Sequence, residues 1–545
     1  MLGHFQIPKP QNEKIYDYSK GTKEANALKA ELKRLSSETI EIPLFINGKE
    51  VFTGSTGEFT SPHNHSLKLA KYHKASKEHV QQAIDSAMAA KKEWENYTYH
   101  ERASIFLRAA ELLAGPYRAT LNAATMLGQS KTAYQAEIDS ACEAIDFLRF
   151  NSYFMSKIYE NQPNSSAGIW NYMEYRPLDG FVFAVTPFNF TAIALNLITS
   201  VMLMGNTVVW KPAMSALYSA HFIVQLLKKA GLPDGVLNML QGPGSVIGPM
   251  VITDPNLAGI HFTGSTDVFN GMYKSIGENI AKYRCYPRLV GETGGKDFIF
   301  AHSSADVKAL KAAMVRGSYE YQGQKCSAAS RAYIPKSVWN AMKDDLIKDI
   351  KAIKMGDPED FSNFMSAVID NSSFENIKKY IDYAANSNEA QILAGGGCDK
   401  SKGYFVEPTL ILTTNPMFKT MHEEIFGPVM TVYVYDDADY EKTLDLCVNT
   451  SVYALTGSIF ADSRQAIKTA FEKLRHSAGN FYINDKPTGA VVGQQPFGGS
   501  MKSGTNDKAG SYLNLIRWVS PRAIKETLCP SSEIIYDYMK THDNK

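Results

Sequence analysis

Phe181-Val182-Phe183-Ala184-Val185 is the first of four short apolar runs that decide the fold of this sequence. The other three are Thr207-Val208-Val209-Trp210, Val236-Leu237-Asn238-Met239-Leu240 and Gly259-Ile260-His261-Phe262. Amphipathic segments with helical spacing lie between them, namely Ala216–Ala230 and Ser245–Ile252. Strands that are apolar throughout and alternate with helices are typical of a parallel sheet covered on both faces. We therefore predict an α/β domain here.

A second alternating block follows Lys296, with strand-like runs at residues 298–300, 331–334 and 429–433. Helical periodicity dominates the chain before the first block, at Lys77–Trp94, Tyr99–Ala114 and Tyr134–Ser156. A chain of 545 residues exceeds the roughly 250–300 residues that one hydrophobic core serves. We predict two α/β domains and an appendage. The first domain comprises residues 1–159 and 174–296, the second residues 297–485, and the appendage residues 160–173 and 486–545.

Composition excludes several classes of protein. The 57 Lys and Arg residues against 56 Asp and Glu leave a net charge of +1, so we expect no nucleic-acid partner. The most apolar run, Ala192–Gly205, is shorter than the roughly 20 residues of a membrane span. Six scattered cysteines without a C-x-x-C pair predict neither a disulfide framework nor a zinc cluster.

The first twenty residues lack arginine and include Glu13 and Asp17, unlike a signal or transit peptide. We therefore expect a cytoplasmic protein, or one of the mitochondrial matrix if a presequence has already been removed.

Four polar residues occupy positions that suit chemistry. Asn189 and Lys211 follow apolar strands, and the carboxyl edge of a parallel sheet is where α/β folds bind ligands. Glu292 ends another strand between glycines. Cys326 follows Lys325 among polar residues, where we expect a thiolate to be favoured. Taken one at a time, Asn189, Lys211 and Glu292 are better explained as solvated loop residues, and most cysteines are inert small hydrophobes.

Two glycine-containing stretches suggest nucleotide binding more weakly. Gly242-Pro243-Gly244 is better explained as a turn than as a dinucleotide fingerprint. Thr263-Gly264-Ser265 follows a strand and precedes a helix, so it fits a phosphate cradle at the helix N-terminus. A simple N-cap explains the same residues.

Taken together, seven motifs within about residues 45–530 resemble those of the aldehyde dehydrogenase superfamily, and they occur in the same order as in that superfamily. They are Pro187-Phe188-Asn189, Trp210-Lys211-Pro212, Phe262-Thr263-Gly264-Ser265, Gly291-Glu292-Thr293-Gly294-Gly295-Lys296, Gly323-Gln324-Lys325-Cys326, Glu423-Glu424-Ile425-Phe426-Gly427-Pro428 and Pro496-Phe497-Gly498-Gly499. Thr293 departs from the usual leucine and points to a subfamily. The resemblance implies a Rossmann-like NAD-binding domain, an α/β catalytic domain and a small oligomerisation arm.

Further strings resemble the branch of this family that oxidises L-glutamate γ-semialdehyde, formed from Δ1-pyrroline-5-carboxylate, in proline breakdown. They are Thr186–Thr191, the looser Gln135–Asp139, Tyr404–Pro408, Gly479–Lys486, Val492–Gly499 and Ser503–Lys508. A chain of this length has no room for the proline dehydrogenase barrel of fused relatives. The alternatives are a dehydrogenase for another semialdehyde or an aliphatic aldehyde, and a non-catalytic module that keeps this fold.

The resemblance assigns the catalytic roles. Cys326 would attack the aldehyde, the Asn189 amide would hold the developing oxyanion, and Glu292 would activate the water that hydrolyses the thioester. It assigns NAD as cofactor, with NADP left open because Lys211 tolerates a phosphate, and it assigns no metal. The cofactor contacts it implies are Thr186, Pro187, Phe188, Lys211, Gly264, Ser265, Glu424 and Phe426.

The resemblance also implies substrate contacts and an assembly. Ser327, Gly489 and Ala490 would bind the α-carboxylate of the small-molecule substrate, and Phe190 and Phe497 would enclose its stem. Ala490 stands where many relatives have serine. We expect a homodimer or a dimer-based oligomer, in which a strand at Leu515–Val519 crosses to the partner's sheet.

Overall fold

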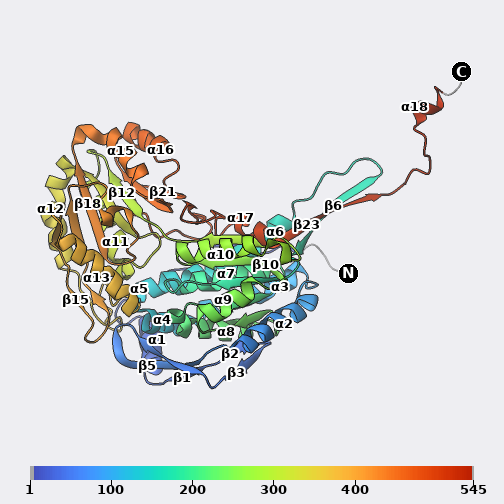
Figure 1. The fold of residues 1–545 in the computed structure, drawn as a ribbon, viewed down its shortest axis with the longest axis horizontal. Helices are drawn as coiled ribbons and strands as arrows, with labels where there is room; N and C mark the ends of the chain where they lie inside the picture. Colours follow the sequence, from blue (N-terminus) through green and yellow to red (C-terminus); the bar gives the residue numbers. More distant parts are fainter. Residues whose placement is uncertain (1–4, 543–545) are drawn as a thin grey trace.

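The computed structural model describes residues 5–542, which contain two seven-stranded sheets (Figure 1). The first has the order β11-β10-β7-β8-β9-β2-β3, and its five strands from β11 to β9 are parallel. Its strands are β2 (Leu44–Ile46), β3 (Lys49–Val51), β7 (Phe181–Val185), β8 (Val208–Lys211), β9 (Leu237–Met239), β10 (Leu257–Thr263) and β11 (Arg288–Glu292). All four predicted strands of the first block are confirmed.

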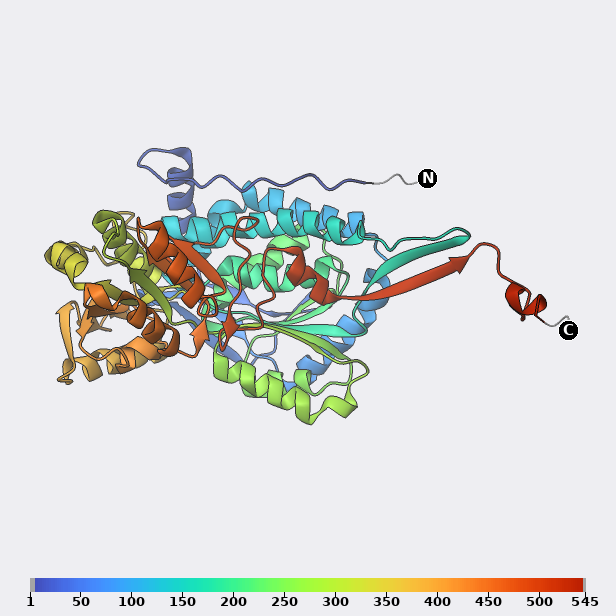
Figure 2. The same ribbon diagram turned by 90° about the horizontal axis from the view of Figure 1, so that it is seen from above.

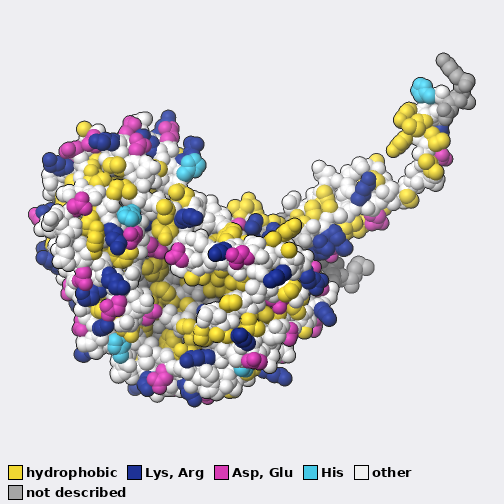
Figure 3. All heavy atoms as spheres, in the orientation of Figure 1, with side chains coloured by type: hydrophobic (Ala, Val, Ile, Leu, Met, Phe, Trp, Pro, Cys, Tyr) yellow, Lys and Arg dark blue, Asp and Glu magenta, His cyan; other side chains and the backbone are white. Residues whose placement is uncertain are grey.

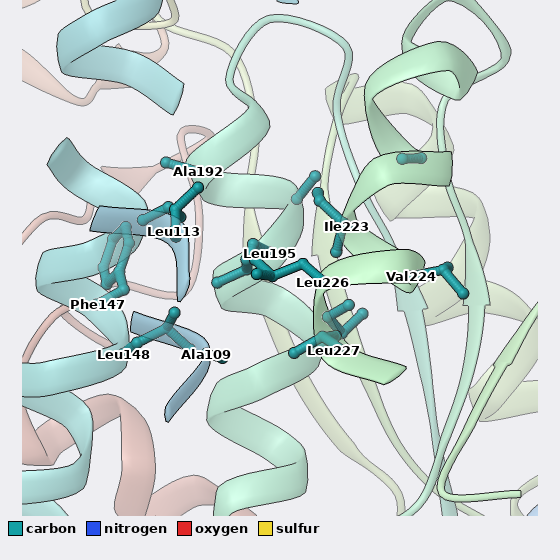
Figure 4. Packing of buried hydrophobic residues seen from close by; sticks show 14 of the residues in the cluster. Ala109, Leu113, Phe147, Leu148, Ala192, Leu195, Ile223, Val224, Leu226 and Leu227 are labelled. Carbon is teal, nitrogen blue, oxygen red and sulfur yellow. The ribbon is translucent and has the colours of Figure 1, made fainter. Parts of the chain in front are cut away.

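Side chains that alternate along β7 supply the cores on the two faces of this sheet. Phe181 and Phe183 face one core, whereas Val182 and Ala184 face the other. Figure 4 shows the second core, where residues of α3, α6, α7 and α8 interlock. The helices around the sheet are α2 (Lys77–Trp94), α3 (Tyr99–Ala114), α4 (Arg118–Gln129), α6 (Glu143–Tyr159), α7 (Thr191–Leu203), α8 (Leu217–Ala230), α9 (Gly244–Ile252) and α10 (Thr266–Glu278).

The predicted helix at 134–156 is interrupted. It begins as α5 (Ala133–Ala136), passes through a π-helical turn over Glu137–Cys142 and continues as α6. Buried polar contacts explain the wider turn, because Arg118 pairs with Glu137 and also donates to the Cys142 sulfur. Such turns often mark functional sites.

The second sheet has the order β14-β17-β18-β13-β12-β20-β21, parallel except for β14 at its edge. Its strands are β12 (Asp297–Ala301), β13 (Ala329–Pro335), β14 (Ala390–Ala394), β17 (Thr409–Thr413), β18 (Val429–Tyr435), β20 (Thr456–Phe460) and β21 (Asn480–Ile483). The helices packed with them are α11 (Val307–Tyr319), α12 (Lys336–Lys351), α13 (Asn371–Ala385), α15 (Tyr440–Asn449) and α16 (Arg464–Lys473).

A two-stranded arm projects from the body of the molecule (Figures 1 and 2). It pairs β6 (Ile169–Pro177) antiparallel with β23 (Val519–Thr527). The predicted strand at Leu515–Val519 is wrong, since these residues end α17 (Tyr512–Leu515), form a 3-10 turn and only then begin β23. The cause is burial, because Leu515 and Trp518, three residues apart, both point into the core shown in Figure 4 and are 0% exposed.

The segment 488–510 connects the two sheet domains at the site. Gly499 and Thr505 bond to the end of β11, whereas Ser503 and Pro496 bond to Ala454 and Asn480 of the second domain. Among the residues described, no helix has the length and apolar character that a membrane crossing requires. Within the same residues, no group of three or more His, Cys, Asp or Glu side chains is arranged to hold a metal ion.

Candidate active site

Cys326 lies in a rigid loop between α11 and β13. Tyr321 and Gln322, just before it, have φ angles of 50° and 56°, which are strained for residues with side chains. The Gln322 amide holds this turn in place, donating to the carbonyls of Ser130 at 3.1 Å and Ala367 at 2.6 Å. The thiol is thereby fixed at a buried position, 8% exposed, where three cavities meet.

The expected stabilisation of the Cys326 thiolate by Lys325 is wrong. The Lys325 ammonium lies 3.8 Å from Asp139 and 3.6 Å from Glu320, so its charge is shared with their carboxylates. Burial, together with the nearby carboxylate of Glu292, raises the pKa of the Cys326 thiol well above its usual value. Attack by this sulfur would therefore require loss of the thiol proton.

Asn189 lies between β7 and α7, at the carboxyl edge of the first sheet. Its side-chain amide donates to the Gln324 carbonyl at 3.0 Å, which ties it to the Cys326 loop. The amide carries two N–H groups, so a second donor is available for a ligand oxygen. Asn189 and Cys326 line the same cavity.

Glu292 ends β11, and its Oε1 accepts the Gly499 N–H at 2.8 Å. Burial raises the pKa of Glu292 to about 8, while the Gly499 hydrogen bond and the Lys508 charge oppose that rise. The unusual Thr293 beside it donates to the Lys502 carbonyl at 2.5 Å. This threonine therefore fastens the segment that carries Gly499 to the end of β11.

A cavity of about 810 Å³ opens at the carboxyl edge of the first sheet and reaches Cys326. It brings together all eight residues predicted to contact the cofactor: Thr186, Pro187, Phe188, Lys211, Gly264, Ser265, Glu424 and Phe426. Ser265 is the N-cap residue of α10, but within residues 5–542 its hydroxyl accepts no capping hydrogen bond. The α10 N-terminus therefore keeps N–H groups for a phosphate, and the simple N-cap explanation loses support.

A second cavity of about 390 Å³ lies on the other side of Cys326. It contains all five residues predicted for the substrate: Ser327, Gly489, Ala490, Phe190 and Phe497. Ser327 donates to the Thr488 hydroxyl at 2.9 Å, and Lys486 donates to the Thr488 carbonyl at 2.8 Å. With Gly489 at φ 101°, this turn can aim successive N–H groups at an anion.

This cavity also holds a cluster of ionisable side chains to which the sequence motifs assigned no role. Asp139, Glu143 and Lys325 line it, and Lys131 pairs with Asp139 and lies 4.2 Å from the Phe190 ring. Burial and the charge of Asp139 raise the pKa of Glu143 well above its usual value. The signal in the sequence was the i, i+4 spacing of Asp139 and Glu143 within an apolar helix.

Comparison with known proteins agrees with this geometry. The model of the aldehyde dehydrogenase family matches residues 52–518. The "Delta-1-pyrroline-5-carboxylate dehydrogenase, mitochondrial" of Dictyostelium discoideum is 51% identical, covering 100% of this chain and 99% of that protein. The "Probable delta-1-pyrroline-5-carboxylate dehydrogenase" of Schizosaccharomyces pombe is 48% identical, and the match covers 98% of this chain and 99% of that protein.

A solved structure matches as well. The Delta-pyrroline-5-carboxylate dehydrogenase from Mycobacterium tuberculosis bound with NAD superposes with a TM-score of 0.96 at 49% identity. The match covers 99% of this chain and 100% of that one. The family match and these full-length likenesses show that the chain belongs to the aldehyde dehydrogenase family.

Proposed function

We propose that the protein oxidises L-glutamate γ-semialdehyde, the open form of Δ1-pyrroline-5-carboxylate, to L-glutamate with NAD, as in proline degradation. One observation carries this proposal: the Cys326 thiol stands where a cofactor-sized cavity and a substrate-sized cavity meet. Relatives with this named activity match the chain over its full length. An aldehyde bound in one cavity would thus reach the thiol beside a cofactor bound in the other.

The larger cavity suits NAD. Its volume, the open α10 N-terminus and the polar ends of Lys211 and Glu424 fit a dinucleotide with two ribose rings and a pyrophosphate. Lys211 and Glu424 would bind ribose hydroxyls, and Gly264 and Ser265 would approach the pyrophosphate. Bound NAD supplies the hydride acceptor. The residues that hold it belong chiefly to segments 1–159 and 174–296, which we propose as the cofactor domain.

The chain's own groups would carry the other steps. The Cys326 thiol passes its proton to water in the adjoining small cavity, and the sulfur attacks the aldehyde carbon. The Asn189 amide and the Cys326 backbone N–H hold the developing oxyanion. Loss of hydride from the adduct leaves a thioester on Cys326. Glu292 then takes a proton from water, which attacks the thioester and releases the acid.

The smaller cavity has complementary groups for both charged groups of the substrate, which lie at the end away from the aldehyde. The Thr488–Ala490 turn and Ser327 would bind the α-carboxylate through N–H and hydroxyl donors. Glu143 would face the ammonium group, and a cation there favours the charged form of a buried carboxyl. Phe190 and Phe497 would enclose the aliphatic stem. A simple aldehyde such as propanal uses none of the charged contacts.

Glu143→Gln should therefore weaken selection for the semialdehyde. A charge-assisted hydrogen bond contributes about 1.5–3 kcal/mol, so we expect kcat/KM for the semialdehyde to fall about 10- to 100-fold. The value for propanal, measured on the same preparation, should change little. An equal loss for both substrates would mean that Glu143 maintains the structure of the cavity and does not select the substrate.

The projecting arm supports a dimer. Among the residues described, the outer edge of β23 is unpaired, whereas Gln162 and Ser165 bond to Met173 and Asn171 along the outer edge of β6. Large apolar side chains gather in the tail beyond the ribbon (Figure 3). Ile534 is 97% exposed, and Tyr536 and Tyr538 are 69% and 63% exposed. Open strand edges and apolar side chains invite pairing, so we propose that two copies exchange arms.

Light scattering at micromolar concentration should give at least twice the monomer mass of 60.4 kDa. Removing residues 520–545 deletes all of β23 except Val519 and should yield a monomer. A monomeric mass for the full chain, or an unchanged mass after the deletion, would contradict the exchange of arms.

The compartment is a further proposal. The D. discoideum relative is named as mitochondrial. We propose the cytoplasm for this protein, or the mitochondrial matrix if a presequence is removed. Cell fractionation followed by an activity assay distinguishes the two.

NADH formation, followed by absorbance with a panel of aldehydes, tests the proposed function. We expect L-glutamate γ-semialdehyde to give the highest kcat/KM, well above propanal and other semialdehydes. A preference for propanal would indicate that the protein is a general aldehyde dehydrogenase. No NADH from any aldehyde would favour a non-catalytic module.

A further inference from the structure

Lys508 reaches the catalytic carboxylate through a single peptide group. Its ammonium donates to the Gly498 carbonyl at 2.9 Å, and the N–H of the same peptide unit, that of Gly499, donates to Glu292 at 2.8 Å. An ammonium bound to a carbonyl polarises the peptide, which strengthens the hydrogen bond that its N–H donates. Lys508, the Gly498–Gly499 peptide and Glu292 therefore form one chain of charge-assisted hydrogen bonds.

The surroundings fix this peptide in one orientation. Lys508 also donates to the Gly479 carbonyl at 2.8 Å, and the Gly498 N–H donates to Asn480 at 3.2 Å. A side chain on Gly499 would lie 2.7 Å from Leu455, so glycine lets the peptide approach this closely. The N–H that faces Glu292 is thus held before any substrate arrives.

The backbone of Lys508 is strained. Its φ of 54° is left-handed, a conformation that residues with a side chain rarely adopt. Such strain persists where the neighbouring structure overrides it, and it is concentrated at functional sites. Here two hydrogen bonds between Phe497 and Ala509, 3.0 and 2.7 Å long, clamp the backbone. The side chain is thereby directed at the Gly498 carbonyl.

A cavity of about 50 Å³ lies beside this chain of contacts, large enough for water. Glu292, Cys326 and Lys508 all line it. Five further titratable groups face Glu292 or share this cavity: Asp297 of β12, Asp507 beside Lys508, Glu143 of α6, His261 of β10 and the Cys326 thiol. Burial lowers the pKa of His261 to about 4, so its imidazole is neutral at pH 7. Among Lys508 and these five groups, Lys508 is therefore the cation.

We propose that Lys508 is a positioning residue for the water-activating carboxylate of Glu292, acting through the Gly498–Gly499 peptide group. The proposal rests on the proposed function, because it needs a thioester that Glu292 helps to hydrolyse. The positive charge and the oriented N–H both stabilise the ionised form of Glu292. Hydrolysis therefore continues at a lower pH than burial alone would allow.

Lys508→Gln removes the charge and should shift the pH dependence of hydrolysis. The readout is the decay of acyl-enzyme in acid-quenched samples, measured across pH once the aldehyde is consumed. Hydrolysis needs the Glu292 carboxylate, so its rate falls as the pH drops below the carboxyl pKa. We expect the midpoint to rise by about one pH unit, the lower end of what a nearby opposite charge contributes. Formation of the first NADH per site should be retained.

Two further variants separate positioning from packing. Lys508→Arg keeps the charge and should restore at least half of the shift. Lys468→Gln removes an exposed positive charge from α16 and should leave the midpoint unchanged. An unshifted midpoint in Lys508→Gln, or a shift that arginine does not reverse, overturns the proposal. Propanal gives the same test if the semialdehyde is not a substrate, so failure of the proposed function is recognised separately.

Discussion

Cys326→Ala should abolish oxidation of every aldehyde while NAD binding persists. The substitution removes the sulfur that forms the covalent adduct, and the cofactor cavity keeps its other contacts. Since the chemistry has no second route, we expect activity to fall at least about 10⁴-fold. NADH production and calorimetric titration with NAD measure the two properties on one sample.

Cys142 is the rival nucleophile, because it also lines the substrate cavity. Cys142 does not line the cofactor cavity, so an adduct on its sulfur would lie away from bound NAD, and this cysteine should be inert. Cys398→Ala, which removes a half-buried cysteine, serves as the matched control and should keep full activity. Turnover that survives in Cys326→Ala together with alkylation of Cys142 would move the nucleophile to Cys142.

Glu292→Gln should uncouple the two halves of the reaction. The amide keeps the size of the side chain, but it cannot take a proton from water. We expect rapid formation of about one NADH per site, followed by steady-state turnover reduced about 10²- to 10⁴-fold, the usual contribution of a general base. Stopped-flow absorbance resolves both phases. Undiminished steady-state turnover would mean that another group activates the water.

The pattern of apolar runs was sufficient to predict the two sheets, because parallel strands buried on both faces have a distinctive composition. It failed at Leu515–Val519, where an apolar run suits a strand and a buried helical turn equally. Only the position of Trp518 in the core shown in Figure 4 decides between them. The π-helical turn at Glu137–Cys142 depends on a distant partner, Arg118, and so leaves no local signal.

Motifs predicted which side chains gather at the site, since eight cofactor and five substrate positions line the two cavities that meet at Cys326. They did not predict the electrostatics. Lys325 neighbours Cys326 in sequence, but its charge is directed at Asp139 and Glu320. Lys508 lies 182 residues after Cys326, but it acts on Glu292 through one peptide group. Side-chain direction depends on the fold, which a linear motif does not encode.

Mass spectrometry of Glu292→Gln, mixed with L-glutamate γ-semialdehyde and NAD and then quenched in acid, detects the covalent intermediate itself. We expect a glutamyl group attached as a thioester to the peptide that contains Cys326, in an amount equal to the NADH formed. NADH formation without this adduct, or with the adduct on another cysteine, would contradict it.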